Sequence, residues 1–244
     1  MTVSQPAKSI KPKVIAAIPC YNEERFIGEV VLKAKRHVDQ VIVIDDGSRD
    51  STVEAAKVAG ALIVNHGVNK GYGESVKSCF AAAKTNHADV LVIFDGDGQH
   101  NPDELPPALA LILNGRADMV IGSRFLSGQT HIPRYRKFGI DVITWLFNVG
   151  SKVKVSDAQS GFRVYSRRIL DTISLTEKGM AISVEVIIKA REKGFTIQEV
   201  PISCTYHSKS STLNPVSHGL SVAFATVKLR FGILLRSLIG GNNA

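Results

Sequence analysis

Two carboxylates one residue apart, Asp95 and Asp97, follow an apolar, β-branched run in the sequence at Val90–Phe94. The glycines beside them leave both carboxylates able to turn toward one hard cation, with positions left open for phosphate oxygens. A Mg²⁺ or Mn²⁺ ion on a diphosphate needs this kind of site. A polar surface turn accounts for the same pattern when it stands alone, so the choice depends on the residues around it.

The elements that must position these carboxylates alternate along the first half of the chain. Short apolar runs are separated by helical patterns, which is typical of βαβ crossovers and a mainly parallel sheet. The length of 244 residues and the apolar content of 44% fit one large α/β domain. In open parallel sheets, ligands bind beyond the carboxyl ends of the strands. The predicted strands are Val14–Ile18, Val41–Asp45, Leu62–Val64, Val90–Phe94 and Met119–Ile121.

In the second half of the chain, strand and helix patterns alternate less regularly. We expect its elements to pack onto the same sheet and to complete the acceptor side of a cleft. They are helices near Ile140–Phe147 and Ser183–Lys193 and strands at Phe162–Tyr165 and Thr196–Val200. The predicted organisation is a loose N-terminal tail over residues 1–12, a single catalytic domain over 13–215 and a C-terminal helix over 216–244.

The charge of the chain is unevenly distributed. The formal net charge is +8, and the segment Ser123–Arg168 holds nine basic residues and two acids, a local net of 9 − 2 = +7. This segment should face something anionic. Nucleic acid, an anionic membrane surface and a phosphorylated substrate all fit this charge.

The cysteines and the apolar C-terminal segment indicate the setting in which the protein works. Three cysteines, far apart and without CxxC spacing, favour a reducing cytosolic setting over a disulfide framework or a zinc site. The segment Leu220–Leu238 carries Lys228 and Arg230 near its centre, and each charge would cost about 2.5–3.5 kcal/mol inside a bilayer. An interfacial or core helix is the better interpretation. We therefore expect a cytoplasmic protein that binds peripherally at the cytosolic face of a membrane.

Other predicted strand ends are also polar. The first strand ends in Pro19-Cys20-Tyr21-Asn22-Glu23-Glu24, the second in Asp45-Asp46-Gly47-Ser48, and the third leads to Asn69-Lys70-Gly71-Tyr72-Gly73. A carboxylate such as Asp46 can accept hydrogen bonds from ring N–H groups or ribose hydroxyls, or it can support a helix cap or a turn. The loop at Lys70 would let backbone and ammonium approach sugar phosphates, although glycine-rich loops also form for turn reasons.

In order and spacing, these motifs together with Asp95-x-Asp97-x-Gln99-His100 resemble those of family 2 glycosyltransferases. The closer match is to the polyprenyl-phosphate branch of that family, the dolichyl-phosphate mannose synthases and related glucosyl and N-acetylglucosaminyl enzymes. This closer resemblance is carried by Gly122-Ser123-Arg124-Phe125 and Asp157-x-x-Ser160-Gly161-Phe162-Arg163, and the whole covers about residues 13 to 210. It implies a GT-A type nucleotide-diphospho-sugar transferase fold.

The resemblance also implies roles for the strand-end residues. The residues that would hold the base and ribose of the donor are Pro19, Tyr21, Glu23 and Asp46. Those that would hold the metal and the diphosphate are Asp95, Asp97 and Gln99. A loop similar to one that closes over the donor in the family carries a further diphosphate contact, Lys209. The implied reaction is an inverting, metal-dependent hexose transfer, with GDP-mannose as the first choice of donor and UDP-glucose or UDP-N-acetylglucosamine as alternatives.

The acceptor decides what else the site needs. A hydroxyl acceptor needs a positioned carboxylate to take its proton, and family relatives with such acceptors use an acid in the later region, where Asp157 and Glu185 lie. A polyprenyl phosphate is already anionic and needs cations that bring two negative reactants together, a task that suits the bidentate grip of arginine. We therefore predict an acceptor-phosphate site made by Arg124, Arg134 and Arg136, with Asp157 beside them.

Other charged residues of this region have simpler interpretations. Glu185 sits among apolar neighbours on a predicted helix, where a buried structural ion pair would explain it. Four further bases fit solvated surface positions, and these are Lys152, Lys154, Arg167 and Arg168.

Three alternatives stand beside this hypothesis. The same fold could transfer a sugar to a hydroxyl of a small molecule or a glycan. A nucleotidylyltransferase usually has a glycine-rich, basic loop after the first strand, whereas Pro19–Glu24 has no glycine and two acids. A nucleic-acid-binding module would bring phosphates against the carboxylates of Asp46 and Asp95. In such a module the Lys and Arg residues are interleaved with stacking aromatic residues, which is not the case here. We therefore expect no nucleic-acid partner.

Overall fold

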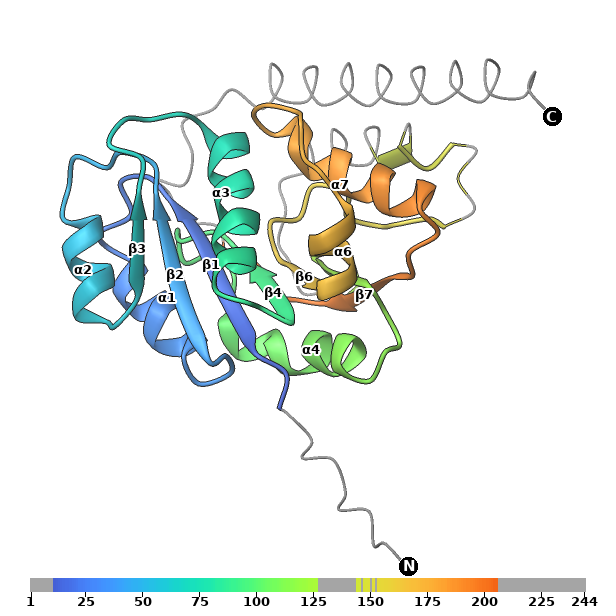
Figure 1. The fold of residues 1–244 in the computed structure, drawn as a ribbon, viewed down its shortest axis with the longest axis horizontal. Helices are drawn as coiled ribbons and strands as arrows, with labels where there is room; N and C mark the ends of the chain where they lie inside the picture. Colours follow the sequence, from blue (N-terminus) through green and yellow to red (C-terminus); the bar gives the residue numbers. More distant parts are fainter. Residues whose placement is uncertain (1–10, 127–143, 146, 150, 152, 206–244) are drawn as a thin grey trace, which may run out of the picture.

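A seven-stranded sheet lies at the centre of the molecule and determines where the polar strand ends meet (Figure 1). The structure is a computed structural model of the chain, and it describes residues 11–126, 144–145, 147–149, 151 and 153–205. The strand order is β3-β2-β1-β4-β6-β5-β7. The strands are β1 (Val14–Cys20), β2 (Gln40–Asp45), β3 (Leu62–Asn65), β4 (Val90–Ile93), β5 (Met119–Ser123), β6 (Arg163–Ser166) and β7 (Ile197–Pro201).

The sheet is mainly parallel, as predicted. Only β6 runs antiparallel to its neighbours β4 and β5, and every other neighbouring pair is parallel. Because β6 runs in the opposite direction, it begins at the edge where β4 and β5 end. The register places its first residue, Arg163, level with Ile93 of β4 and Ile121 of β5. The apolar pattern of the sequence does not reveal this reversal, since a buried strand reads the same in both directions.

Helices cover both faces of the sheet (Figure 1). Along β1, Ile15 and Ala17 join the core beneath α3, α6 and α7, while Val14, Ala16 and Ile18 join the core beneath α1, α2 and α4. Both faces of the strand are therefore buried, which explains its continuous apolar run. The helices are α1 (Ile27–Ala34), α2 (Thr52–Val58), α3 (Tyr72–Thr85), α4 (Leu105–Leu113), α6 (Arg167–Thr172) and α7 (Ala181–Glu192), with a 3₁₀ turn, η1 (Pro102–Glu104).

Local signals in the sequence mark several helix ends. The side chain of Asn101 accepts a hydrogen bond from the N–H of Asp103 at 3.2 Å and opens η1. At the start of α2, Asp50 Oδ1 accepts from the N–H of Thr52 at 3.0 Å. Gly60 follows α2 with φ of +87°, a conformation that favours glycine. Residues of these types commonly begin and end helices.

Some predicted segments lie wholly or mostly outside the described residues. These are the tail over 1–12, the helix near Ile140–Phe147 and the C-terminal helix over 216–244. Within the part of the chain that the structure describes, no helix is both long and apolar enough to cross a membrane.

The strand order reverses at β1, which has β2 on one side and β4 on the other. The carboxyl ends of β1 and β2 are level, because Cys20 is aligned with Asp45. Asp95 follows β4 at the same edge of the sheet. Open α/β sheets bind ligands in the crevice at such a reversal, so the fold brings the polar strand ends together at the expected place.

Close packing at Gly122 in β5 leads to a test of the fold. A Cβ atom on Gly122 would lie 2.7 Å from Phe162 Cδ1 and 2.9 Å from Ile202 Cδ1. We expect Gly122→Ala to lower the free energy of unfolding by about 1–3 kcal/mol because the core has no room for the methyl group. Denaturant unfolding measures this change.

The matched control is Gly28→Ala in α1, where the added Cβ would lie 3.8 Å from the nearest atom, Ala55 O. There the same substitution should raise the free energy of unfolding by about 0.5 kcal/mol, because alanine favours the helix. Equal effects at the two positions would contradict the packing described for Gly122.

Candidate active site

The Asp95-Gly96-Asp97 turn follows β4 at the reversal of the sheet. Both carboxylate residues are half-buried, and Gly96 between them packs so tightly on Cys20 Sγ that no Cβ fits there. The N–H of Gln99 donates to Asp97 Oδ1 at 3.0 Å. The turn therefore lies at a strand end with its carboxylates close together, as predicted.

Carboxyl groups from two strand ends repel one another at this turn. Burial, and after it the negative charge of Asp97, raises the pKa of Asp95 to about 7, against the opposing effect of Arg124. Burial and then the charges of Asp97 and Asp95 raise the pKa of Glu23 to about 7 as well. The structure thus concentrates negative charge from the ends of β1 and β4 in one place.

This concentration of charge suits a hard divalent cation. Carboxylate oxygens are the ligands that such cations prefer, and a cation between Asp95 and Asp97 would offset the repulsion between them. Within the described residues, no group of three or more His, Cys, Asp or Glu side chains has the arrangement of a metal site. Two carboxylates suit a cation whose other positions are taken by a diphosphate. The residues present therefore fit Mg²⁺ or Mn²⁺, and the binding itself stays a prediction.

Gln99, the third predicted metal ligand, connects the turn to the segment after β7. Its backbone carbonyl accepts a hydrogen bond from the N–H of Thr205 at 2.9 Å, and its side-chain oxygen lies 3.8 Å from Cys204 Sγ. The N–H of Ser203 donates to the carboxylate oxygens of Glu104 at 3.1 and 2.9 Å. The chain that leaves β7 is therefore held against the carboxylate turn.

Asp46 is buried beneath the loop between β3 and α3 and fixes the shape of that loop. Its Oδ1 accepts from the N–H of Lys70 at 2.9 Å and lies 2.7 Å from His66 Nδ1, and its Oδ2 accepts from the N–H of Gly71 at 2.8 Å. The other ring nitrogen of His66 lies 2.8 Å from Ser78 Oγ in α3. The alternative interpretation of Asp46 as support for a turn is therefore confirmed, and its contact with base or ribose stays a prediction.

The remaining donor-side residues lie along the same edge of the sheet. Pro19 is buried in β1, and the ring of Tyr21 just beyond it is 42% exposed. The N–H of Glu23 donates to Thr52 Oγ1 at 2.7 Å, which ties the loop after β1 to the start of α2. Lys70 is exposed. These positions agree with the predicted donor contacts without testing them.

Arg124 follows β5 and is gripped by Asp157. Its Nε donates to Oδ2 at 2.7 Å and its Nη2 to Oδ1 at 2.8 Å, the two parallel bonds typical of arginine–carboxylate pairs. The Asp157 side chain is fully buried, whereas that of Arg124 is 13% exposed. Asp157 therefore orients Arg124, as predicted. The contact of Arg124 with an acceptor and a catalytic role of Asp157 stay predictions.

Glu199 in β7 holds the loop that carries Asp157. Its carboxylate accepts from the N–H of Ser156 at 2.9 and 2.8 Å, from the Ser156 hydroxyl at 3.0 Å and from the N–H of Asp157 at 3.1 Å. Sequence reasoning missed Glu199, because it belongs to no motif. An acid within an otherwise apolar strand pattern was the one signal that pointed to it.

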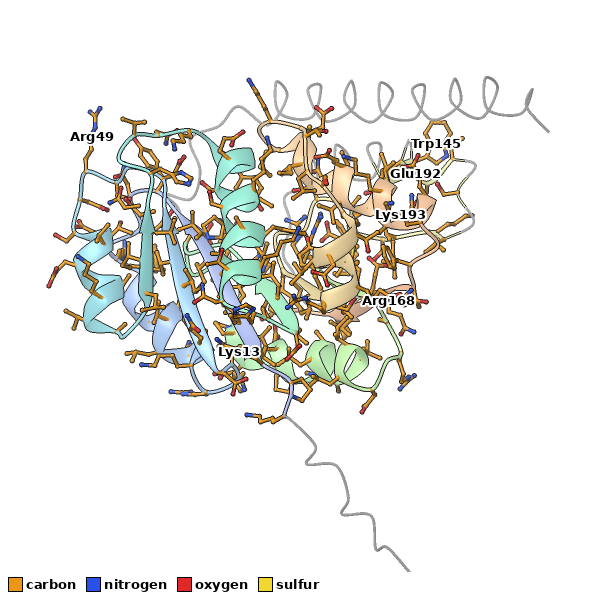
Figure 2. All side chains as sticks on the ribbon, in the orientation of Figure 1. Lys13, Arg49, Trp145, Arg168, Glu192 and Lys193 are labelled. Carbon is orange, nitrogen blue, oxygen red and sulfur yellow. The ribbon has the colours of Figure 1, made fainter. Side chains whose placement is uncertain are left out.

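Three residues of the predicted site, Arg134, Arg136 and Lys209, lie outside the described residues, so their roles stay predictions. Of the bases expected at the surface, Arg167 pairs with Asp171 at 2.9 Å across one helical turn. The Arg168 side chain, labelled in Figure 2, is 73% exposed and pairs with Asp118 at 2.9 Å. Surface positions are therefore confirmed for both of these bases.

Glu185 in α7 is engaged in structural contacts. Its side chain is fully buried, and it accepts from the N–H of Thr176 at 2.8 Å, from the N–H of Glu177 at 2.9 Å and from Lys189 Nζ at 2.6 Å. The interpretation as a buried structural ion pair is confirmed.

Solved structures place this architecture in a known class. The structure of glucosyl-3-phosphoglycerate synthase from Mycobacterium tuberculosis with Mn²⁺, uridine diphosphate and glucosyl-3-phosphoglycerate is similar, with a TM-score of 0.71 and 21% identity, over 91% of this chain and 80% of that chain. A structure of the same protein with Mg²⁺ and uridine diphosphate has a TM-score of 0.69 at 21% identity over the same shares of both chains. The fold is that of the GT-A glycosyltransferases.

Sequence comparison narrows this class to a family. The family model described as Glycosyl transferase family 2 matches residues 15–174, well over half of the chain. This chain belongs to glycosyltransferase family 2 and is therefore a glycosyltransferase, as the motifs predicted.

Relatives of known name share most of its length. A UDP-N-acetylglucosamine–dolichyl-phosphate N-acetylglucosaminyltransferase of Methanococcus voltae is 30% identical, over 89% of this chain and 96% of the relative. A dolichyl-phosphate hexose transferase of Haloferax volcanii is 32% identical, over 86% and 90%. A polyprenol monophosphomannose synthase of Mycolicibacterium smegmatis is 32% identical, over 79% and 77%.

The burial of the Arg124–Asp157 pair predicts a large cost when it is broken. Asp157→Ala should lower the free energy of unfolding by about 3 kcal/mol, because it leaves a mostly buried guanidinium without its carboxylate. Urea unfolding at one fixed pH measures the change. Asp171→Ala is the matched control, since it breaks an exposed pair with Arg167 and should cost less than about 1 kcal/mol. Similar costs for the two substitutions would contradict the importance assigned to burial.

Proposed function

We propose that this glycosyltransferase moves a hexose from a nucleotide-diphosphate sugar to the phosphate of dolichol or another polyprenol, with inversion at the anomeric carbon. GDP-mannose is the donor that we favour, with UDP-glucose and UDP-N-acetylglucosamine as alternatives. The names of the relatives support this acceptor class, and they include both mannose and N-acetylglucosamine transfer. They do not select one sugar.

The observation that carries the choice of acceptor is that both acids on the acceptor side are already engaged. Asp157 is buried against Arg124, and Glu185 is buried against Lys189 and the backbone near Thr176. Neither carboxylate can take a proton from a hydroxyl without giving up these partners. A phosphate acceptor needs no such base, because its attacking oxygen is already anionic.

Arg124 supplies what a phosphate acceptor needs instead. Asp157 holds the guanidinium of Arg124 in one orientation. Burial raises the pKa of Asp95, and the charge of Arg124 is close enough to the carboxylate turn to oppose that rise. An oriented guanidinium suits a phosphate group and offsets the repulsion between an anionic acceptor and the diphosphate of the donor. We propose Arg134 and Arg136 as further contacts of the acceptor phosphate.

On the donor side, we propose that the carboxylate turn orients the diphosphate and the loops after β1 and β3 bind the rest of the nucleotide. The proposed ligands of the cation are Asp95, Asp97 and Gln99. The proposed contacts of base and ribose are Pro19, Tyr21, Glu23 and Asp46. The proposed contacts of the sugar phosphates are Lys70 and Lys209.

The proposed reaction is an in-line displacement. An oxygen of the acceptor phosphate attacks the anomeric carbon, the bond from that carbon to the β-phosphate oxygen breaks, and the nucleoside diphosphate leaves with the bonding electrons. Mg²⁺ or Mn²⁺, when bound, stabilises the negative charge that develops on the leaving diphosphate. Arg124 and the carboxylate turn hold the two anionic reactants in position. Because a polyprenyl phosphate resides in a membrane, we also propose that the protein works peripherally at the cytosolic membrane face.

The acceptor is tested with two lipids that differ only in the phosphate. Purified protein and Mn²⁺ are incubated with labelled GDP-mannose, UDP-glucose or UDP-N-acetylglucosamine and either a short polyprenyl phosphate or the matching polyprenol. We expect one donor to transfer label into organic-extractable product with the phosphate and none to do so with the alcohol. No extractable label with any donor would overturn the acceptor assignment, and label on the alcohol would favour a hydroxyl acceptor.

The role of the carboxylate turn predicts a strong effect of Asp97→Asn. The substitution should lower kcat/KM by about 100-fold to 1000-fold, because it removes a charge that orients the cation and the leaving diphosphate. Chelation of the metal should abolish activity in the wild type. Asp103→Asn is the control, since Asp103 in η1 is exposed and lies 2.8 Å from His37 Nε2, and it should change kcat/KM by less than about twofold. Wild-type activity in Asp97→Asn would refute the metal site.

A further inference from the structure

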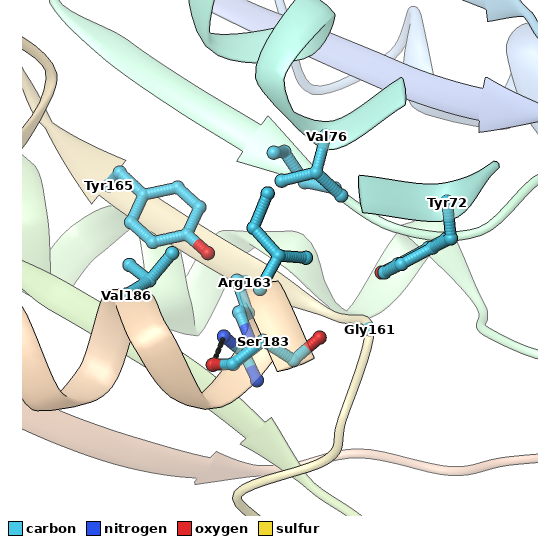
Figure 3. A pocket seen from close by; sticks show the side chains of 9 residues that line it. Tyr72, Val76, Gly161, Arg163, Tyr165, Ser183 and Val186 are labelled. Atoms are coloured by element: carbon cyan, nitrogen blue, oxygen red, sulfur yellow. Dashed lines mark hydrogen bonds between the residues drawn. The ribbon is translucent and has the colours of Figure 1, made fainter. Parts of the chain in front are cut away.

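Arg163 is the first residue of β6, which lies between β4 and β5. β4 leads to the carboxylate turn, the donor half of the site, and β5 leads to Arg124, the acceptor half. The register of Arg163 with Ile93 of β4 and Ile121 of β5 puts it just below the carboxylate turn on one side and Arg124 on the other. Arg163 is only 3% exposed. Together with Tyr72 and Tyr165 it lines a small pocket between α3, α7 and β6 (Figure 3).

Each nitrogen of the Arg163 guanidinium donates to a backbone carbonyl. Nε donates to Ser160 O at 2.9 Å, and Nη2 donates to Ala158 O at 2.8 Å. Nη1 donates to Ser183 O in α7 at 2.5 Å, the bond that is dashed in Figure 3. The guanidinium therefore fastens the loop over residues 157–161, which we term the coupling loop, to α7.

The two ends of the coupling loop contact different halves of the site. At one end, the Asp157 carboxylate grips Arg124 through two hydrogen bonds. At the other end, Gly161 packs so closely on Asp95 that an added Cβ would lie 3.0 Å from Asp95 Cγ and overlap Oδ2. A shift of this loop would therefore move the position of Arg124 and the environment of Asp95 together.

The chemistry of Arg163 indicates more than a role in filling space. No carboxylate among the described residues lies within ion-pair distance of it, and its guanidinium donates to three neutral carbonyls. Its positive charge also acts on the nearby Asp95 carboxylate. Burying a cation in this way has a desolvation cost that a neutral donor would avoid. What arginine adds is a rigid planar fork that bonds three carbonyls at once. Such a fork fixes the loop in one shape.

We propose that Arg163 is a positioning residue that couples the two halves of the active site. By holding Ala158 and Ser160, it sets where Gly161 meets Asp95 and where Asp157 presents Arg124. This inference rests on the proposed function, since that function assigns Asp95 to the donor and Arg124 to the acceptor. It adds a residue that acts on both substrates through the coupling loop without touching either.

Arg163→Lys tests the proposal, because lysine keeps the charge but cannot bond three carbonyls as a fork. Two constants are measured. The first is the dissociation constant of Mn²⁺ with GDP or UDP, followed by the electron paramagnetic resonance of free Mn²⁺ without turnover. The second is the KM for a short polyprenyl phosphate. We expect each constant to rise about tenfold, which is typical when a residue that orients the ligand-binding residues is changed.

Two further variants sharpen the test. Arg167→Lys is the matched control, because Arg167 lies on α6 in an exposed pair with Asp171, and both constants should stay within about twofold of the wild type. Glu199→Gln loosens only the Asp157 end of the coupling loop. It should raise the KM for the polyprenyl phosphate and leave the dissociation constant of Mn²⁺ unchanged.

Several outcomes would overturn the proposal. If Arg163→Lys lowers the Tm but leaves both constants unchanged, Arg163 is only structural. If one constant rises and the other does not, the halves are not coupled. Should Arg163→Lys fail to fold, Ser160→Ala takes its place. Ser160 Oγ accepts a hydrogen bond from the N–H of Phe162 at 3.2 Å, and loss of this bond should loosen the same loop mildly. Both constants should then rise about threefold, and no change in either would overturn the proposal.

The outcome for the proposed function is distinguishable from these results. If the wild type makes no lipid product, the acceptor assignment fails. The Mn²⁺ titration of Arg163→Lys against the wild type still tests the donor half, and an unchanged dissociation constant would overturn the proposal on its own.

Discussion

Repulsion among the carboxylates at the ends of β1 and β4 is the interaction on which the rest of the site depends. Asp95, Asp97 and Glu23 are held close together although each disfavours the charge of the others. Tight packing keeps them there, with Gly96 against Cys20 and Gly161 against Asp95. A site that holds like charges together before any ligand binds is preorganised for a cation. The bound cation would in turn stabilise the negative charges of these carboxylates.

Other buried or half-buried acids hold loops in place. Asp46, Glu104, Glu185 and Glu199 each accept hydrogen bonds from backbone N–H groups, and for Asp46, Glu104 and Glu199 these groups lie more than 20 residues away in the sequence. Backbone donors satisfy these carboxylates, so their burial is tolerated and their loops are fixed. These four acids therefore fasten loops, whereas Asp95, Asp97 and Glu23 are left close to one another at the turn.

Much of the site could be predicted because strand ends are local features. The apolar run before Asp95 and the one before Arg124 predicted two parallel strands, and parallel strands bring their carboxyl ends to one edge. The bonds from Glu199 to Ser156, from His66 to Asp46 and from Arg163 to Ser183 could not be predicted in the same way. Each joins segments 20 or more residues apart, and none of these three contacts leaves a periodic or spaced pattern.

The direction of β6 was hidden for a related reason. A short buried strand has the same apolar pattern in either direction, so only its pairing with β4 and β5 shows that it is antiparallel. Asp157 illustrates the limit at the level of one residue. A role for it in orienting an arginine could be predicted from its motif, but its complete burial against Arg124 depends on the packing of β7 and the coupling loop.

The place of β6 between β4 and β5 also sets an order of events during synthesis of the chain. Strands β1 to β4 can pair as each one leaves the ribosome, because every neighbour among them has already been made. β5 has no such neighbour until β6 and β7 emerge, so the backbone N–H and C=O groups along its edges stay unpaired by the sheet while the intervening segment is translated. At about 5–20 residues per second, this interval lasts roughly 2–8 s. The half of the sheet formed by β1 to β4 is thus the older part of each new molecule, and the half formed by β5 to β7 is completed last.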